Sequence, residues 1–454
     1  MSDSEDGGIT EDSCAAEWSI TREWLEGILQ EHHVRLKETG AREEPEGKKD
    51  EEQINNELAR PSVVDYQVRP GCSAGESVLS DILAVNLEYR LAADHPVRQL
   101  SLIVKRLPQD PYSRFFVTEA QFDLREIRFY TQVVPDLEVF QRQNKLNSAS
   151  TTKLPIPRCI HAHYSPAGGT EDSPVPPESF LVLENLSSRG FEGAEFSRGL
   201  TLRQAEAALT AVARVHALSL SLKVKEDTSL SERYPFLFQT ARATDSYQQL
   251  VERGLPQLAR FLERRPGLEA VLEALLALRP RTKEVIASLL APEGPIALIT
   301  HTDFWSNNLL FRMGTEKDGN NSGSCECAIL DWQMVTYSRP TNDVALLLVS
   351  SVPSELRRRH TSSLLDTYWA SLTGTCAALG LDVTGRLGYN RADLDRDYRS
   401  SQLLALLLCI GSVDVALGDP MTEQRLIDVL EDLHADGVLA IGDIIKPPVL
   451  DDIV

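Results

Sequence analysis

The sequence is poor in basic residues relative to acidic ones. Its 454 residues include 46 Lys and Arg against 67 Asp and Glu, which gives a formal net charge of −21. A chain of this charge repels phosphate backbones and anionic lipid surfaces. We therefore expect neither nucleic acid nor a membrane surface among its partners, and we expect a globular protein, because 42% of the residues are hydrophobic.

The sequence also lacks a long hydrophobic run, and its number of cysteines is odd. The longest apolar stretch, Leu403 to Val413, falls short of the roughly 20 residues that a membrane span needs. The seven cysteines are an odd number spread over the chain, which favours free thiols in a reducing compartment. The first residues have neither the positive charge nor the apolar segment of a secretory signal. We expect a cytoplasmic protein.

The patterns of charge and hydrophobicity divide the chain into three parts. Residues 1–60 carry −10 of the net charge and contain an amphipathic helix at Ile20 to His33 and a charged, flexible insert at Lys37 to Arg60. Residues 61–185 are rich in strand patterns, and residues 186–454 are mostly helical.

Individual elements follow from the spacing of apolar residues. Strands are predicted at Ser77–Leu91, Leu100–Leu107, Phe180–Leu183 and Ile296–Thr300, and a hairpin joins Leu309–Phe311 to Cys327–Leu330. Helices are predicted at Phe115–Gln132, Arg203–Leu222, Asp245–Glu263, Leu268–Leu290, Thr341–Ser350, Ser354–Leu379, Arg391–Ala416 and Met421–His434. Pro256 and Pro280 are expected to kink or split two of them. This order predicts a two-lobed α+β architecture with a cleft.

The most informative stretch is ITHTDFWSNNLLF, at residues 299–311. In it an apolar strand ends in His-x-Asp at Asp303, and Asn308 follows five residues later. A second carboxylate, Asp331, stands 28 residues after Asp303, at the end of the second strand of the predicted hairpin, in ILDWQ. A loop Asp, an amide oxygen and a strand-end Asp in this order are typical of phosphoryl transfer, with Asp303 as the base and Asn308 and Asp331 as Mg²⁺ ligands.

These motifs resemble a known family. The segments HTDFWSNNLLF and ILDWQMV, with Arg339-Pro and Asn342-Asp343 after them, are similar to the ecdysteroid kinase-like family, within the choline kinase and aminoglycoside phosphotransferase group of protein-kinase-like folds. Thr302 replaces the usual Gly and Trp332 the usual Phe, and neither change removes a reactive group. The resemblance implies an antiparallel sheet in a nucleotide-binding N-lobe (residues 61–185) and a mostly helical, catalytic and acceptor-binding C-lobe (residues 186–454).

The resemblance also assigns residues of the N-lobe to nucleotide binding. The segment GCSAGES at residues 71–77 is similar to the turn that covers the phosphates, in which Gly71 and Gly75 allow close approach of the backbone. Ser73 of the same turn is assigned to nucleotide binding with them. Lys105 matches the lysine of the α- and β-phosphates. Its ion-pair partner is then Glu126, in a Glu-x-x-Phe-Tyr pattern, with Glu119 as the second candidate.

Four further residues are interpreted, two of them by the same resemblance. FLVLENL, at residues 180–186, is similar to the connector between lobes, where the Glu184 carbonyl and the Leu186 amide would hold the adenine. His301 is interpreted as an organiser of its loop through backbone near Asp331. Asp343 is interpreted as a cap at the start of the following helix.

The acceptor is expected to be a small molecule. Only about ten residues separate Asp331 from the helix at Thr341, and this leaves no room for the activation segment and Ala-Pro-Glu motif of a protein kinase. The resemblance implies ATP and Mg²⁺ as cofactors and a hydroxylated steroid, such as an ecdysteroid, as acceptor. Two alternatives stay open, namely an amino-alcohol kinase of the choline or aminoglycoside type and a kinase-shaped binding protein without turnover. The oligomeric state is open as well.

Several aromatic residues could line the acceptor pocket. Trp305, Trp332, Tyr337, Tyr368 and Trp369 are candidates for its walls, but aromatics at helical spacing more often belong to a core. Acidic residues in the pocket would favour an amino alcohol, and an apolar pocket would favour a sterol.

Overall fold

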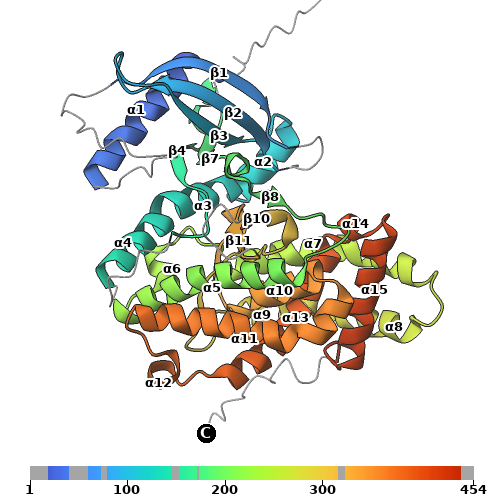
Figure 1. Cartoon of the computed structure of the whole chain (residues 1–454). Helices are drawn as coiled ribbons and strands as arrows, with labels where there is room; N and C mark the ends of the chain where they lie inside the picture. The colour runs from blue at the N-terminus through green and yellow to red at the C-terminus, as the bar shows by residue number, and fades with distance from the viewer. Residues whose placement is uncertain are drawn as a thin grey trace, which may run out of the picture. The chain divides into compact units, whose positions relative to one another are not determined.

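The computed structural model describes residues 19–39, 60–72, 79–144, 153–170, 173–314 and 323–440. They form two compact units, residues 1–77 with 82–104 and residues 78–81 with 105–454. Antiparallel strands dominate the N-terminal part and helices the C-terminal part, which confirms the predicted α+β class (Figure 1). The predicted boundaries after residues 60 and 185 stay predictions.

The first unit pairs one helix with a short antiparallel sheet. Its elements are α1 (Arg22–Thr39), β1 (Ser62–Pro70), β2 (Asp81–Arg90) and β3 (Arg98–Arg106), and the strands lie in the order β1-β2-β3. The predicted amphipathic helix is confirmed, because Leu25, Ile28 and Leu29 on one face of α1 are buried. Glu26 of that helix accepts a hydrogen bond from the Val63 amide of β1 at 2.9 Å.

The strands of the second unit are short and antiparallel. They are β4 (Cys159–Ser165), β5 (Gly168–Thr170), β6 (Ser173–Val175), β7 (Glu178–Glu184), β8 (Glu192–Gly193), β9 (Leu298–Thr300), β10 (Leu309–Met313), β11 (Cys325–Ile329) and β12 (Thr336–Ser338). β4 pairs with β7, β12 with β9, and β10 lies between β11 and β8. The predicted hairpin is β10 with β11, in which Leu309 faces Ile329.

Helices make up the rest of the second unit. They are α2 (Pro111–Glu119), α3 (Phe122–Arg128), a π-helix (Phe129–Val133), α4 (Val134–Asn144), α5 (Leu202–Lys225), α6 (Leu230–Arg233), α7 (Thr240–Leu262), α8 (Glu269–Leu278), α9 (Thr282–Leu290), α10 (Thr341–Ser351), α11 (Ser354–Ala378), α12 (Val383–Leu387), α13 (Arg391–Gly411), α14 (Val413–Ala416) and α15 (Pro420–Ala435). Capping boxes fix two starts, at Thr201 before α5 and at Asn390 before α13.

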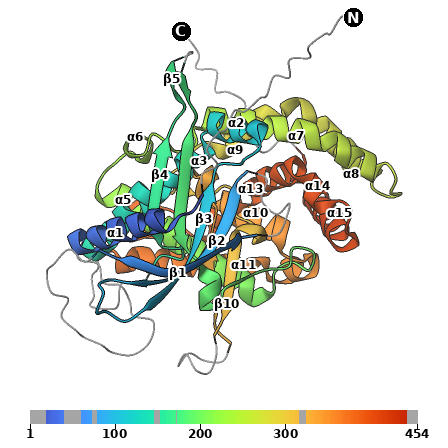
Figure 2. The same ribbon diagram turned by 90° about the horizontal axis from the view of Figure 1, so that it is seen from above.

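One apolar core runs through this helical unit. α5 lies against α11, and α10 and α7 pack on α13 (Figures 1 and 2). α5 is the one helix of the described ranges that is long and apolar enough to cross a membrane, but 72% of that apolar window is buried in the fold. The prediction that Leu403 to Val413 belongs to a buried helix is confirmed for Leu403–Ile410 of α13.

Two predicted elements differ from the observed ones. The helix predicted at Phe115–Gln132 is broken between α2 and α3, because Gln121 takes a left-handed φ of 58°. α7 continues through Pro256, so a split there is wrong, and a kink stays a prediction. The break at Pro280 is confirmed by a 3-10 turn at Arg279–Arg281 between α8 and α9. The insert predicted at Lys37 to Arg60 lies mostly outside the described residues.

The contact between α7 and α13 depends on glycine. A methyl group at Gly254 of α7 would collide with the carbonyl oxygen of Ile410 in α13. The two helices therefore approach at a distance that only a hydrogen side chain permits. Gly374 of α11 is different, since a methyl group there would meet nothing within 4 Å.

We predict opposite effects for alanine at these two helical glycines. Gly254→Ala should lower the free energy of unfolding by about 2–3 kcal/mol, because the helices must separate. Gly374→Ala should raise it by about 0.5–1 kcal/mol, because alanine favours a helix and nothing obstructs it. Urea unfolding of the full chain measures both, and a stabilising Gly254→Ala would contradict the close contact.

Candidate functional site

The loop that follows β9 holds the first two candidate residues close together. This Asp303 loop (residues 301–308) ends in a 3-10 turn at Ser306–Asn308, directly before β10. The Asn308 amide nitrogen donates to the Asp303 carboxylate at 2.8 Å and to the Asp303 carbonyl at 2.9 Å. These two bonds fix the side chain of Asp303 and leave the amide oxygen of Asn308 as a potential metal ligand.

The backbone is strained at two positions of the site. Thr302 and Asp331 have φ values of 66° and 59°, in the left-handed region that non-glycine residues rarely adopt. Thr302 stands where the family usually has Gly, and this φ is the physical reason for that preference. The strain is held locally, since the Thr302 hydroxyl lies 3.0 Å from that of Thr300 and its amide is hydrogen-bonded as well.

Asp343 holds the Asp303 loop from the opposite side. Its carboxylate is fully buried and accepts hydrogen bonds from the amides of His301 and Thr302, both at 2.7 Å. His216 lies 3.0 Å from the same carboxylate and 2.9 Å from the Tyr368 hydroxyl. The interpretation of Asp343 as a helix cap is wrong, because the carboxylate reaches back to the loop while α10 begins without a side-chain cap.

His301 connects the Asp303 loop to the Asp331 segment. Its Nδ1 accepts a hydrogen bond from the Asp303 amide at 3.2 Å, and its Nε2 lies 2.8 Å from the Leu330 carbonyl. These partners require the neutral tautomer with the proton on Nε2. His301 thus contacts backbone beside Asp331, as the sequence analysis anticipated. The Leu330 amide in turn donates to the Asn308 carbonyl at 2.8 Å.

Lys105 joins two carboxylates that are far apart in the sequence. Its ammonium lies 2.7 Å from Glu126 of α3 and 2.9 Å from Asp331. Burial would lower the pKa of Lys105, but the charges of Asp331 and Glu126 outweigh it and raise the pKa. The lysine is therefore charged at neutral pH. Glu119, the second candidate partner, ends α2.

Burial also acts on the carboxylates of the site. It raises the pKa of Glu126 against the opposing charge of Lys105. It likewise raises the pKa of Asp303, where the nearby Asp331 adds to the rise, while His301 and the hydrogen bond from Asn308 oppose it. A carboxyl group with a raised pKa is a stronger proton acceptor than an exposed one.

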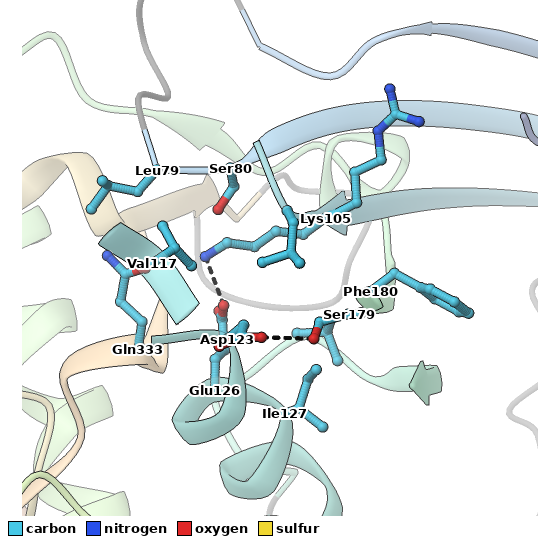
Figure 3. Close-up of a pocket in the computed structure, with 13 residues that line it drawn as sticks. Leu79, Ser80, Lys105, Val117, Asp123, Glu126, Ile127, Ser179, Phe180 and Gln333 are labelled. Carbon is cyan, nitrogen blue, oxygen red and sulfur yellow. Dashed lines mark hydrogen bonds and ion pairs between the residues drawn. The ribbon is translucent and has the colours of Figure 1, made fainter. Parts of the chain in front are cut away.

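A hollow lies on the Lys105–Glu126 side of the site. It measures about 320 Å³ up to its open mouth, and its walls come from residues 79–80 and 105–107 and from α2, α3 and β7, all of the second unit (Figure 3). Figure 3 shows the Lys105 ammonium extended toward Glu126, and below it the Ser179 hydroxyl directed at Asp123, 2.6 Å away. Neither Asp303 nor Asn308 lines this hollow.

Aromatic and cationic contacts that the sequence did not reveal support the Asp331 segment. Trp332, the residue after Asp331, is fully buried and stacks on Phe129 of the π-helix with ring centroids 4.0 Å apart. Arg125 donates from Nε to the Gln333 carbonyl at 2.8 Å, and its guanidinium lies 4.0 Å from the Phe238 ring. Burial lowers the pKa of Arg125 to about 10. No motif marks Arg125 or Phe238 for this position.

The remaining nucleotide-binding candidates are placed unevenly. Gly71 directly follows β1, and its amide donates to the Ile82 carbonyl at 2.8 Å, whereas Ser73 and Gly75 lie outside the described residues. The Glu184 side chain accepts from the Arg158 amide at 3.2 Å. Leu186 begins a 3-10 turn, Leu186–Arg189, and is buried. The adenine contacts assigned to these two residues stay a prediction.

The donor set at the Asp303 loop fits magnesium better than a transition metal. Asn308 and Asp331 offer only hard oxygen atoms, which Mg²⁺ prefers in small number. Across the described ranges there is no group of three or more His, Cys, Asp or Glu side chains that could hold a metal ion. A cation here would therefore complete its shell with phosphate and water oxygens.

We predict that the Asp343 carboxylate is a main support of the Asp303 loop. Asp343→Ala leaves two buried amides without an acceptor and should lower the free energy of unfolding by about 2–4 kcal/mol. Asp366→Ala is the matched control, because the Asp366 side chain is 63% exposed and loss of its pair with Arg391 should cost under about 1 kcal/mol. Urea unfolding compares the two, and equal losses would contradict this role.

Several known proteins are similar to this chain. An uncharacterized oxidoreductase of Caenorhabditis elegans, dhs-27, is 20% identical over 322 residues. That match covers 68% of this chain, and the chain spans about a third of that relative's length. Among solved structures, a choline kinase from Cryptosporidium parvum Iowa II gives a TM-score of 0.41 at 12% identity, covering 82% of this chain and 91% of that one.

Two further structures show likeness of the same degree. A Plasmodium vivax ethanolamine kinase has a TM-score of 0.39 at 10% identity and covers 92% of this chain and 91% of its own. A GDP complex of aminoglycoside 2'-phosphotransferase-IIIa has 0.38 at 11%, covering 82% and 92%.

A family model is more decisive. The model of the ecdysteroid kinase-like family matches residues 74–381, about two thirds of the chain. The matched segment includes Lys105, Glu126, the Asp303 loop, Asp331 and Asp343, whose contacts are described above. The chain belongs to the ecdysteroid kinase-like family.

Proposed function

We propose that the protein is a small-molecule kinase that transfers the γ-phosphoryl group of ATP to a hydroxyl group of its acceptor. The observation that carries the proposal is the Lys105 ammonium between Glu126 and Asp331. A lysine fixed by one carboxylate, next to a second carboxylate that is free to bind metal, is the arrangement that phosphoryl transfer uses.

Charge supports this reading of the three side chains. Lys105 carries one positive charge against two carboxylates, so the cluster has an excess negative charge that a divalent cation with its phosphates would compensate. Asp331 is the more accessible carboxylate, with 29% of its side chain exposed against 5% for Glu126. We assign Asp331, with Asn308, to Mg²⁺ and keep Glu126 as the partner that positions Lys105. Bound Mg²⁺ would neutralise charge on the phosphates.

Asp303 is the proposed base. Its carboxylate accepts the proton of the acceptor hydroxyl as the hydroxyl oxygen forms a bond to the γ-phosphorus. The bond from that phosphorus to the β,γ-bridging oxygen breaks, and ADP leaves with the electron pair. Asn308 holds the carboxylate in place, and His301 bonds to the backbone of Asp303 and of Leu330.

The acceptor is a small molecule in this proposal. After Asp331 the chain makes only a 3-10 turn at Trp332–Met334 and the short β12 before α10 begins, so nothing resembles a segment that receives a polypeptide. A hydroxylated steroid, as the family's description suggests, is our proposed acceptor class.

We predict that Asp303→Asn separates binding from transfer. The amide keeps the size of the side chain and an oxygen for Asn308, so the variant should fold and bind Mg·ATP like the wild type. It should lose phosphoryl transfer by roughly 100- to 10,000-fold, because no proton acceptor remains. Asp245→Asn, on the exposed surface of α7, is the control. Acceptor-dependent ADP release measures the rates, and wild-type turnover in Asp303→Asn would refute the base.

We predict a different defect for Asp331→Ala. Loss of this carboxylate should weaken Mg·ATP binding by at least tenfold and raise the Mg²⁺ concentration needed for half-maximal turnover, because one metal ligand is gone. Lys105 keeps its Glu126 partner, so the fold should stay intact. Calorimetric titration of Mg·ATP provides the measurement, and an unchanged Mg²⁺ requirement would count against the assignment.

A further inference from the structure

A second hollow of the helical unit lies beside the Asp303 loop. It measures about 510 Å³ when the open space at its mouth is included. The end of α10, the end of α13, α14 and α15 surround it, and Figure 2 shows α14 and α15 beside α13. The lining residues are Phe196, Trp305, Val349, Ser350, Cys409, Ser412, Val415, Ala416, Thr422, Arg425, Leu426 and Val429.

Trp305 belongs both to the Asp303 loop and to the wall of this hollow. It lies two residues after Asp303 and forms part of the wall, where its ring meets that of Phe196 edge to face at 5.5 Å. Its indole nitrogen is buried and makes no well-formed hydrogen bond with the described residues. Burial raises the pKa of Asp303, and the Trp305 side chain partly opposes that rise.

The wall is apolar and contains no carboxylate among the residues that line it. Its single charged group is Arg425, which is 7% exposed and donates to the Phe196 carbonyl at 2.9 Å. Burial raises the pKa of Cys409 to about 12, so its thiol is uncharged. Two acidic side chains at the start of α15 are engaged elsewhere, since Asp419 caps the helix and Glu423 pairs with Arg265 at 2.7 Å.

We propose that this hollow is the acceptor site, that it takes an uncharged, hydroxylated molecule with a broad apolar face, and that Arg425 makes it reject cationic amino alcohols. The inference rests on the proposed kinase function. An ammonium group entering the hollow would lose its hydration and meet a buried arginine in place of a carboxylate, so its transfer from water is unfavourable. An apolar face would instead gain contact with Phe196, Trp305 and the aliphatic side chains.

Most of this wall lies outside the segment that marks the family. Cys409 to Val429 stand well beyond residue 381, where the match to the family model ends. The phosphoryl-transfer residues thus lie inside the matched segment, whereas the acceptor selectivity proposed here comes mainly from α13–α15, beyond its end.

Blocking the mouth of the hollow tests the site. Ala416 is half-buried at the rim, and Ala416→Phe should fill the hollow, whereas Ala370→Phe on the exposed face of α11 is the control. Equilibrium dialysis of the full chain, without nucleotide, would use ecdysone, quercetin and choline as probes. Wild type should bind at least one of the two uncharged probes, with affinity lowered tenfold or more by Ala416→Phe and less than twofold by Ala370→Phe. Equal binding by both variants, or no binding of either uncharged probe, overturns the site.

Arg425 requires its own variants. Arg425→Gln removes the charge but keeps a donor for the Phe196 carbonyl, and it should raise choline affinity at least tenfold while changing the affinity for the uncharged probe less than threefold. Arg425→Lys keeps the charge and should still exclude choline. Tight choline binding by the wild type, or no gain in Arg425→Gln when circular dichroism shows a native fold, overturns the role of Arg425.

Turnover distinguishes failure of this site from failure of the kinase proposal. If wild type and Ala416→Phe phosphorylate the probe with the same KM, the site is wrong and the kinase function stands. If the probe binds in a way that Ala416→Phe abolishes, yet no ADP forms with Mg·ATP in the wild type, the kinase proposal is wrong.

Discussion

The buried carboxylate of Asp343 is the interaction on which the site depends. A loop with a β-branched residue at positive φ does not keep its shape unaided. Asp343 supplies two short hydrogen bonds at that point, and its own position is fixed by His216, which is held in turn by Tyr368. The rigid helical core thus determines where the Asp303 side chain lies. Thr302 keeps its strained backbone because α5, α10 and α11 pack together and hold the side chains that bind its amide.

Much of the fold was predictable because its elements are long and strongly periodic. α10, α11 and α15 begin within a residue of their predicted starts, since an apolar face repeats over several turns in each. The failures are places where one residue's backbone departs from the local pattern. Nothing in the sequence marks Gln121 for a left-handed φ, and Pro256 sits in a helix whose tertiary packing outweighs the lost hydrogen bond.

The site was predictable where chemistry fixes both residue type and spacing. Motifs describe the charged or oxygen-bearing side chains that this chemistry needs. They pointed to residues that the structure brings into contact, namely Lys105 with Glu126 and Asp331, and Asp303 with Asn308. The supports were not predictable. Arg125 and Phe238 meet through tertiary structure alone, and Asp343 was misread because an acidic residue in a first helical turn looks like a cap. The wall around Trp305 comes from helices without any motif.

The π-helix at Phe129–Val133 has a consequence for comparing this chain with its relatives. A π turn contains one residue more than an α turn, so it is equivalent to a one-residue insertion into a continuous helix. That residue rotates α3 by about 100° relative to α4 about the helix axis. The residues on the face with Glu126 in α3 and those on the face with Leu137 in α4 therefore do not follow one continuous α-helical spacing. A single-residue gap at this point of an alignment would therefore record a change of helical register, and the residues on its two sides should be aligned separately.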